Sequence, residues 1–160
     1  MFKLAEKLMD SYENPYRYKS KKKHPVMDQN VINTYAVKFE NKTMSWEGFP
    51  GKENCKIIET NNYCLTCFLT SWKSVSQIND SLLPDINAAL ADPALEIESD
   101  TATVDIIMGN HLVDFYDRQG YVNSIPLKHF KEIVTLWRDF LTTRPLNGAK
   151  IYFTFFGFSF

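Results

Sequence analysis

The sequence predicts an α+β fold, a single domain in which a mostly antiparallel sheet packs against a few helices. Short β-prone runs separated by turn residues predict the sheet, and one strongly amphipathic segment predicts a helix that covers it. A length of 160 residues suits one domain whose core needs neither disulfides nor a metal. We therefore expect one domain over 1–160, with an N-terminal helix and basic loop in 1–30 and the sheet and helices in 31–160.

Turn residues divide the first half of the chain into short elements. Residues 2–13 have helical spacing, and the polar, basic segment 16–25 is expected to be a loop. The β-prone runs predict four strands, at 31–39, 43–49, 56–60 and 63–70. Helical periodicity returns over 74–91, where Pro84 must either interrupt the helix or begin a second one.

The second half of the chain has clearer patterns. Strands are expected at 94–98, 103–108, 111–116 and 121–125, and Gly109-Asn110 is a two-residue hairpin signal. Pro126 suits the first position of the clearest helix, whose apolar stripe comprises Phe130, Ile133, Val134, Trp137, Phe140 and Leu141. Residues 150–160 are apolar on both alternating faces, which predicts a last strand buried on two sides.

Charge is unevenly distributed along the chain. The whole sequence has 18 Lys and Arg against 19 Asp and Glu, a net charge of -1 that argues against a general nucleic-acid binder. Residues 1–60 carry a net charge of +3, whereas residues 61–160 carry -4. Between Lys73 and Arg118 there are nine acidic residues and no Lys or Arg.

Acidic residues in this tract lie on neighbouring predicted strands. If the strands form as expected, the acids make one negative surface that attracts a basic protein partner. A solvated polar surface is the ordinary alternative, and a catalytic carboxylate pair would need one acid whose pKa is raised by burial. We expect a binding surface and no enzymatic activity, and the candidate partner-binding residues are Glu96, Glu98, Asp105, Asp114, Tyr116 and Asp117.

The cysteines invite a test for redox or zinc chemistry, because Cys64 and Cys67 form a Cys-x-x-Cys motif with Cys55 nearby. The motif lies in the predicted strand 63–70, where residues three apart point to opposite faces and cannot bond each other. No histidine has a paired spacing with the cysteines that would complete a zinc site. We therefore expect three buried structural thiols, no metal and no cofactor.

The basic loop at residues 17–24, which has aromatic neighbours, supports a second hypothesis. Arg17, Lys19 and Lys21–Lys23, interleaved with Tyr16 and Tyr18, resemble segments that track single-stranded nucleic acid, which predicts an RNA-binding or RNA-processing accessory protein as the alternative function. The N-terminus lacks the apolar core of a secretory signal, and no run of 18 apolar residues predicts a membrane helix. We expect a cytoplasmic protein.

The segment from Val122 to Leu141, VNSIPLKHFKEIVTLWRDFL, is similar to a strand, proline turn and Trp-containing helix in bacterial immunity proteins. These proteins belong to contact-dependent growth inhibition and related polymorphic toxin systems. The resemblance covers about an eighth of the chain. It implies an inhibitor that binds the C-terminal domain of a cognate toxin, often a basic nuclease, and blocks its active site. It carries over no binding residue, because the matching segment has the pattern of a core.

Overall fold

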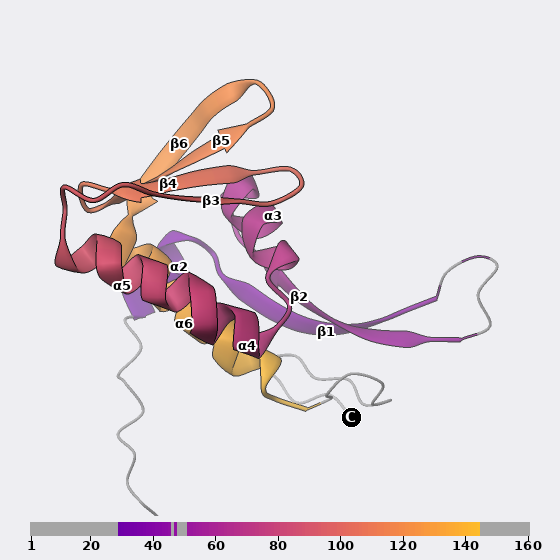
Figure 1. Ribbon diagram of the computed structural model, residues 1–160. Coiled ribbons are helices and arrows are strands. Elements are labelled where there is room, and N and C mark those ends of the chain that lie inside the picture. Colours follow the sequence, from indigo (N-terminus) through magenta and orange to yellow (C-terminus); the bar gives the residue numbers. More distant parts are fainter. Residues whose placement is uncertain (1–28, 46, 48–50, 145–160) are drawn as a thin grey trace, which may run out of the picture.

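The computed structural model describes residues 29–45, 47 and 51–144 (Figure 1). The expected N-terminal helix, the basic loop and the strand at 150–160 lie outside these residues. The helices are α2 (Gln29–Thr34), α3 (Tyr63–Ser71), α4 (Val75–Gln77), the π-helical turn η1 (Ile78–Leu82), α5 (Leu83–Ala91) and α6 (Leu127–Leu141). The strands are β1 (Lys38–Met44), β2 (Glu53–Glu59), β3 (Ile97–Asp100), β4 (Asp105–Gly109), β5 (Leu112–Asp117) and β6 (Gly120–Pro126).

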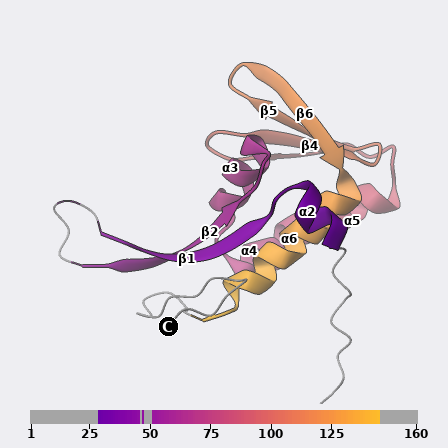
Figure 2. The same cartoon turned by 180° about the vertical axis from the view of Figure 1, so that it is seen from behind.

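All strand pairs are antiparallel, which confirms the predicted α+β class. β1 and β2 form a two-stranded sheet, and the other strands form a four-stranded sheet in the order β3-β4-β5-β6. Figures 1 and 2 show α3, α5 and α6 on one side of the four-stranded sheet and no described helix on the other. Among the described residues, none of the helices combines the length and apolar character needed to cross a membrane.

The prediction of a strand over 31–39 is wrong in its first half. Residues 29–34 form α2, and β1 begins only at Lys38. Val31, Ile32 and Tyr35 are buried, a spacing that fits one face of a helix, and the backbone then turns at Ala36, whose φ is 48°. An apolar run of this length suits a buried helix as well as a strand.

The prediction of a strand over 63–70 is also wrong, because these residues form α3. The side chain of Asn62 accepts a hydrogen bond from the Leu65 backbone N–H at 3.1 Å and so caps the helix. The buried side chains, Cys64, Leu65, Phe68 and Leu69, recur at the helical interval and face the core. The asparagine before the segment and the helical spacing of its apolar residues are the sequence features that indicate a helix here.

Pro84 marks the junction of two helical segments, as expected. It lies in the first turn of α5, where a missing N–H costs little. The preceding turn widens into η1, in which the Leu83 backbone N–H bonds to the Ile78 carbonyl.

The hairpin between β4 and β5 forms one residue later than predicted. The loop is Asn110-His111, and both residues have positive φ angles of 46° and 65°. Gly109 remains in β4, where a Cβ atom would lie 3.1 Å from the Leu95 carbonyl oxygen and 3.2 Å from Glu96 Cγ. The glycine therefore allows the chain before β3 to pass close to β4.

Helix α6 holds the layers together. Pro126 was predicted to be the first helical residue, but it is the N-cap, and α6 begins at Leu127. The predicted stripe is buried from Phe130 to Phe140, and Leu141 packs against it. Phe115 of β5 meets Phe130 edge-on, whereas Phe39 of β1 stacks on Phe140 with ring centroids 5.2 Å apart. The helix thus contacts the four-stranded sheet on one side and β1 on the other.

Lys56 on β2 is a cation at the edge of this core, and we predict a pH effect from it. Its Nζ donates to Asn41 and Thr143 at 3.0 Å and lies 4.2 Å from the Phe140 ring centroid. Burial lowers the pKa of Lys56 from 10.5 to about 8. Between these values the unfolded chain binds more protons than the folded one, so the contribution of Lys56 to stability rises with pH.

Urea unfolding at several pH values from 7 to 10.5 measures this effect. The free energy of unfolding of the wild type should rise relative to that of Lys56→Met across this range. The control is Lys52→Met, which removes an exposed lysine and should keep the wild-type dependence. Parallel curves for the wild type and Lys56→Met would contradict the lowered pKa.

Candidate functional site

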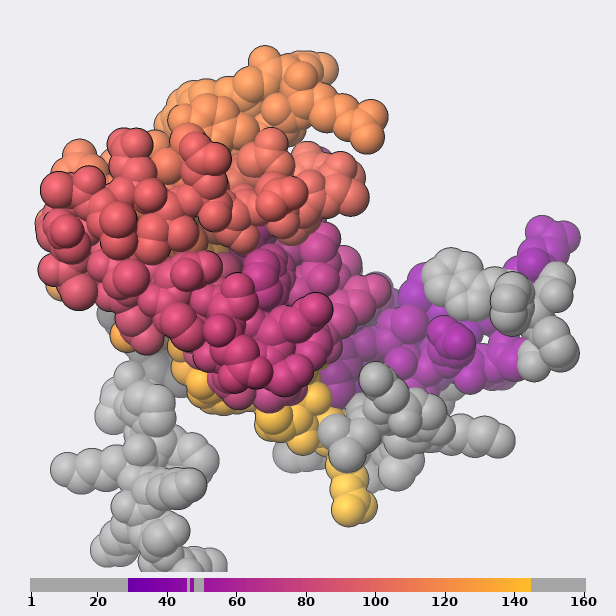
Figure 3. All heavy atoms as spheres, viewed as in Figure 1, coloured from indigo at the N-terminus to yellow at the C-terminus, as the bar shows by residue number. Residues whose placement is uncertain are grey.

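The four-stranded sheet has one buried and one open face. Ile106 and Met108 of β4 and Val113 and Phe115 of β5 are buried beneath the sheet. Because side chains alternate along a strand, their neighbours point away from the helices. In Figure 3 the β5–β6 hairpin, in orange, forms the upper margin of the molecule, above β3 and β4.

Five carboxylates project from this open face. In the strand register, Asp100 lies opposite Asp105, and Ile107 lies between Glu98 and Asp114. Glu96 precedes β3 with the same alternation, and its Cγ lies beside Gly109 on this face. We call this set the acidic face: Glu96, Glu98, Asp100, Asp105 and Asp114. It brings together four of the five predicted acids and adds Asp100.

The acidic face lacks ion-pair partners within the part of the chain that the structure describes. The ion pairs there join Lys42 to Glu40 and Glu59, and Arg138 to Asp139. Like charges directly opposite each other, as at Asp100 and Asp105, destabilise a sheet. The arrangement therefore works against the stability of the isolated fold.

Aromatic side chains adjoin the carboxylates. Tyr116 and Tyr121 pair across β5 and β6 with ring centroids 5.8 Å apart, and Tyr121 is 60% exposed. The Tyr121 hydroxyl lies 2.9 Å from Ser124 Oγ, which in turn donates to Asp114. This chain of hydrogen bonds connects the tyrosine pair to the acidic face. Tyr116 therefore lies beside the acidic face, as predicted, whereas Tyr121 was not among the predicted residues.

Asp117 does not join the acidic face. It alternates with Val113 and Phe115, so it lies on the helix side of β5. Its Oδ1 accepts the Gln119 backbone N–H at 2.7 Å in the β5–β6 turn. Burial raises the pKa of the Cys64 thiol in α3, and the negative charge of Asp117 raises it further by a smaller amount. The expectation that Asp117 shares one surface with the other acids is therefore wrong.

The Cys-x-x-Cys motif lies at the start of α3, so the argument from opposite strand faces is wrong. Residues three apart in a helix lie on the same side. Cys64 is nevertheless buried, Cys55 and Cys67 are half-buried, and all three are free thiols. A raised pKa keeps Cys64 protonated at neutral pH, the opposite of what a reactive thiol needs. No group of three His, Cys, Asp or Glu side chains suited to a metal occurs among the described residues.

No family model, curated protein or solved structure matches the chain.

Proposed function

We propose that the protein is a cytoplasmic immunity protein that binds the C-terminal domain of a cognate toxin, a basic nuclease, and blocks its active site. The acidic face carries this proposal. Its five carboxylates have no ion-pair partner among residues 29–45, 47 and 51–144, and no described helix covers them. A basic partner would supply the missing counter-charges.

The proposed mechanism is occlusion of the toxin. A nuclease binds its substrate phosphates with basic side chains, and the carboxylates of the acidic face would occupy the same positions. Long-range attraction between the two surfaces speeds their encounter. Tyr116 and Tyr121 lie beside the charges and would add apolar contact area, as aromatic residues do at protein interfaces.

The exposure of the carboxylates favours binding over acid–base catalysis. A general acid that works near neutral pH needs burial to keep its proton. Glu96, Glu98, Asp100 and Asp105 are exposed, and Asp114 is half-buried. The site thus provides accessible negative charge, which suits recognition of a basic surface.

Co-expression tests the proposal. The proposal expects that a gene immediately upstream encodes a toxin-like C-terminal domain, and the test expresses that domain in a bacterial host with and without this protein. We expect the domain to stop growth alone, and growth to resume when both proteins are present and form a complex that survives size-exclusion chromatography. Absence of rescue and of a complex would refute the proposal. Tight binding of mixed-sequence RNA by the isolated protein would instead support the RNA-binding alternative.

A further inference from the structure

Strand β3 forms one edge of the four-stranded sheet, and no described strand pairs with its outer side. In the turn to β4 the Thr101 N–H bonds to the Val104 carbonyl at 2.9 Å. Because the direction of the backbone groups alternates along an antiparallel strand, those of Ile97 and Ser99 point to β4. The N–H and C=O groups of the residues between and after them, at positions 98 and 100, therefore point outward.

The side chains of β3 divide by chemistry between the two sides of the sheet. Glu98 and Asp100 are exposed on the acidic face, and Glu96 precedes them with the same alternation. Ile97 lies on the helix side, where it is half-buried and packs against the core. Leu95, which precedes β3, is 39% exposed. The edge therefore combines negative charge on one side with apolar side chains on the other that the described fold covers only in part.

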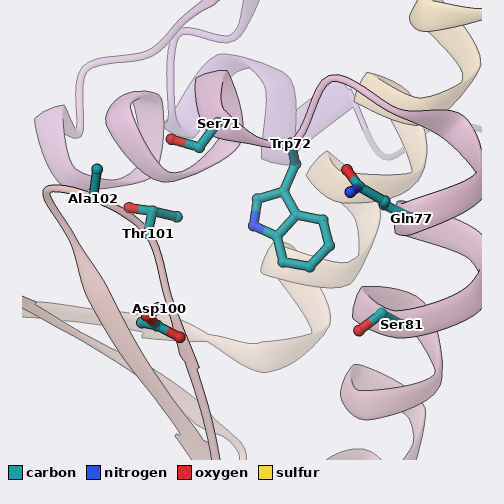
Figure 4. Close-up of a pocket in the computed structure, with 7 residues that line it drawn as sticks. All are labelled: Ser71, Trp72, Gln77, Ser81, Asp100, Thr101 and Ala102. Atoms are coloured by element: carbon teal, nitrogen blue, oxygen red, sulfur yellow. The ribbon is translucent and has the colours of Figure 1, made fainter.

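A shallow pocket of about 470 Å³ adjoins the helix side of this edge (Figure 4). Residues 100–102, at the end of β3 and in the following turn, form one wall, and Ser71, Trp72, Gln77 and Ser81 form the other. No residue of β4 lines the pocket, which places it at the margin of the sheet. A strand added beside β3 would turn every second side chain toward the helices, next to this pocket.

We infer that β3 pairs with an extended segment of the basic protein partner, which joins the sheet as a further antiparallel strand. All pairs already present in this sheet are antiparallel. In such a pairing the outward backbone groups of Glu98 and Asp100 bond to the added strand, and the side chains opposite these two residues lie on the acidic face. The sheet then gains backbone hydrogen bonds and contacts on both of its sides.

Charge decides which segment the edge accepts. Glu96, Glu98 and Asp100 have no ion-pair partner among residues 29–45, 47 and 51–144. Opposite charges on directly opposed residues stabilise a pair of strands, whereas like charges destabilise it. A segment with lysine or arginine at alternate positions suits the acidic side, and apolar residues between them suit the side of Ile97. The identity of the partner as a toxin rests on the proposed function, whereas the geometry of the edge does not.

NMR titration of the full chain tests the edge without the partner. The probe is a hexapeptide of alternating lysine and valine, blocked at both ends. Its binding should slow hydrogen exchange at the Glu98 and Asp100 amides, because it bonds to N–H groups that point outward in the free protein. The Ser99 amide, which already points to β4, should change less. A hexapeptide of alternating glutamate and valine should not bind at the same concentrations, because its charges repel those of β3.

Methylated peptides separate strand pairing from attraction between charges. In the antiparallel pairing the backbone N–H groups of the lysines point toward β3, and those of the valines point away from it. Methylation of the three lysine backbone nitrogens should weaken binding by about fivefold or more, whereas methylation of the three valine nitrogens should leave it within about twofold. The two methylated peptides have the same side chains and charge. Equal affinities of the two would overturn the inference.

Two variants at one position carry the same comparison into the protein. Glu98→Pro removes an outward N–H and keeps the bonds to β4, so it should weaken binding of the unmodified lysine–valine peptide by about fivefold or more. Glu98→Gln loses the same charge but keeps the N–H, and it should weaken binding by only about twofold. Equal affinities of the two variants would contradict pairing through the backbone.

The complex with the toxin-like domain that the proposed function expects distinguishes the two proposals. There the Glu98 and Asp100 amides should be protected as they are with the lysine–valine peptide, and Glu98→Pro should accelerate dissociation. Rescue of growth by a complex in which these amides stay unprotected would refute the added strand and leave the proposed function standing. Binding of the peptide at the edge, without rescue of growth, would refute the toxin partner alone.

Discussion

Replacement of Trp137 by alanine is expected to lower the free energy of unfolding by about 3–5 kcal/mol. The side chain is fully buried in α6, where it stacks on Phe39 and packs at a tilt against Phe140. Its Nε1–H donates to the Trp72 carbonyl at 2.6 Å. The substitution removes the largest fully buried side chain among the described residues, and it leaves the Trp72 carbonyl without its donor. Urea denaturation followed by far-ultraviolet circular dichroism measures the loss.

The variant Trp137→Phe provides the matched control. It keeps an aromatic ring in the core but removes the indole N–H, so we expect a loss of about 1–3 kcal/mol. Equal losses for the alanine and phenylalanine variants would assign the whole effect to the hydrogen bond and contradict the packing role. A loss below about 1 kcal/mol in Trp137→Ala would contradict its place in the core.

Charge reversal on the acidic face should slow association with a basic partner by about tenfold or more at low salt. The variant is Glu98→Lys with Asp105→Lys, two exposed residues on adjacent strands. Attraction between the surfaces becomes repulsion over part of the face, and the dependence of the association rate on salt should weaken. Stopped-flow or surface plasmon resonance measurements with the upstream-encoded domain, at several ionic strengths, give both quantities.

The control carries the same change in net charge at a distant place. Glu47 and Glu53 are exposed residues near the far end of the β1–β2 hairpin, and their reversal should leave the association rate within about twofold. If both double variants slow association equally, net charge alone controls the rate and the acidic face is not the binding surface. Unchanged rate and salt dependence in Glu98→Lys with Asp105→Lys would lead to the same conclusion.

The success of the sequence predictions depended on whether the decisive signal was local. Helix α6 has a long apolar stripe with one period, and β4 to β6 alternate over short distances, so both were predicted to within about two residues. The segments at 31–39 and 63–70 are short apolar runs that suit either a helix or a strand. Their helical state depends on which side chains reach the core and, in α3, on the cap at Asn62.

The candidate site was predictable to the extent that it follows from alternation along strands. Glu98, Asp105 and Asp114 share one face because β3, β4 and β5 pair in a simple antiparallel register. The same alternation puts Asp117 on the side of β5 that carries Val113 and Phe115. The sequence pattern alone therefore separates Asp117 from the other acids. The shallow pocket between Ser71–Trp72, Gln77, Ser81 and residues 100–102 was not predictable, because its walls come from segments brought together only by folding.

Strand β3 lies at the edge of the four-stranded sheet, and no described strand pairs with its outer backbone groups, which could pair with another β-strand. A second copy of the chain is the partner most often within reach at high concentration. The alternate carboxylates at Glu96, Glu98 and Asp100 would then meet identical charges, and the repulsion disfavours edge-to-edge aggregation. The charge pattern that we propose attracts a basic protein thus also protects the fold from polymerising with itself.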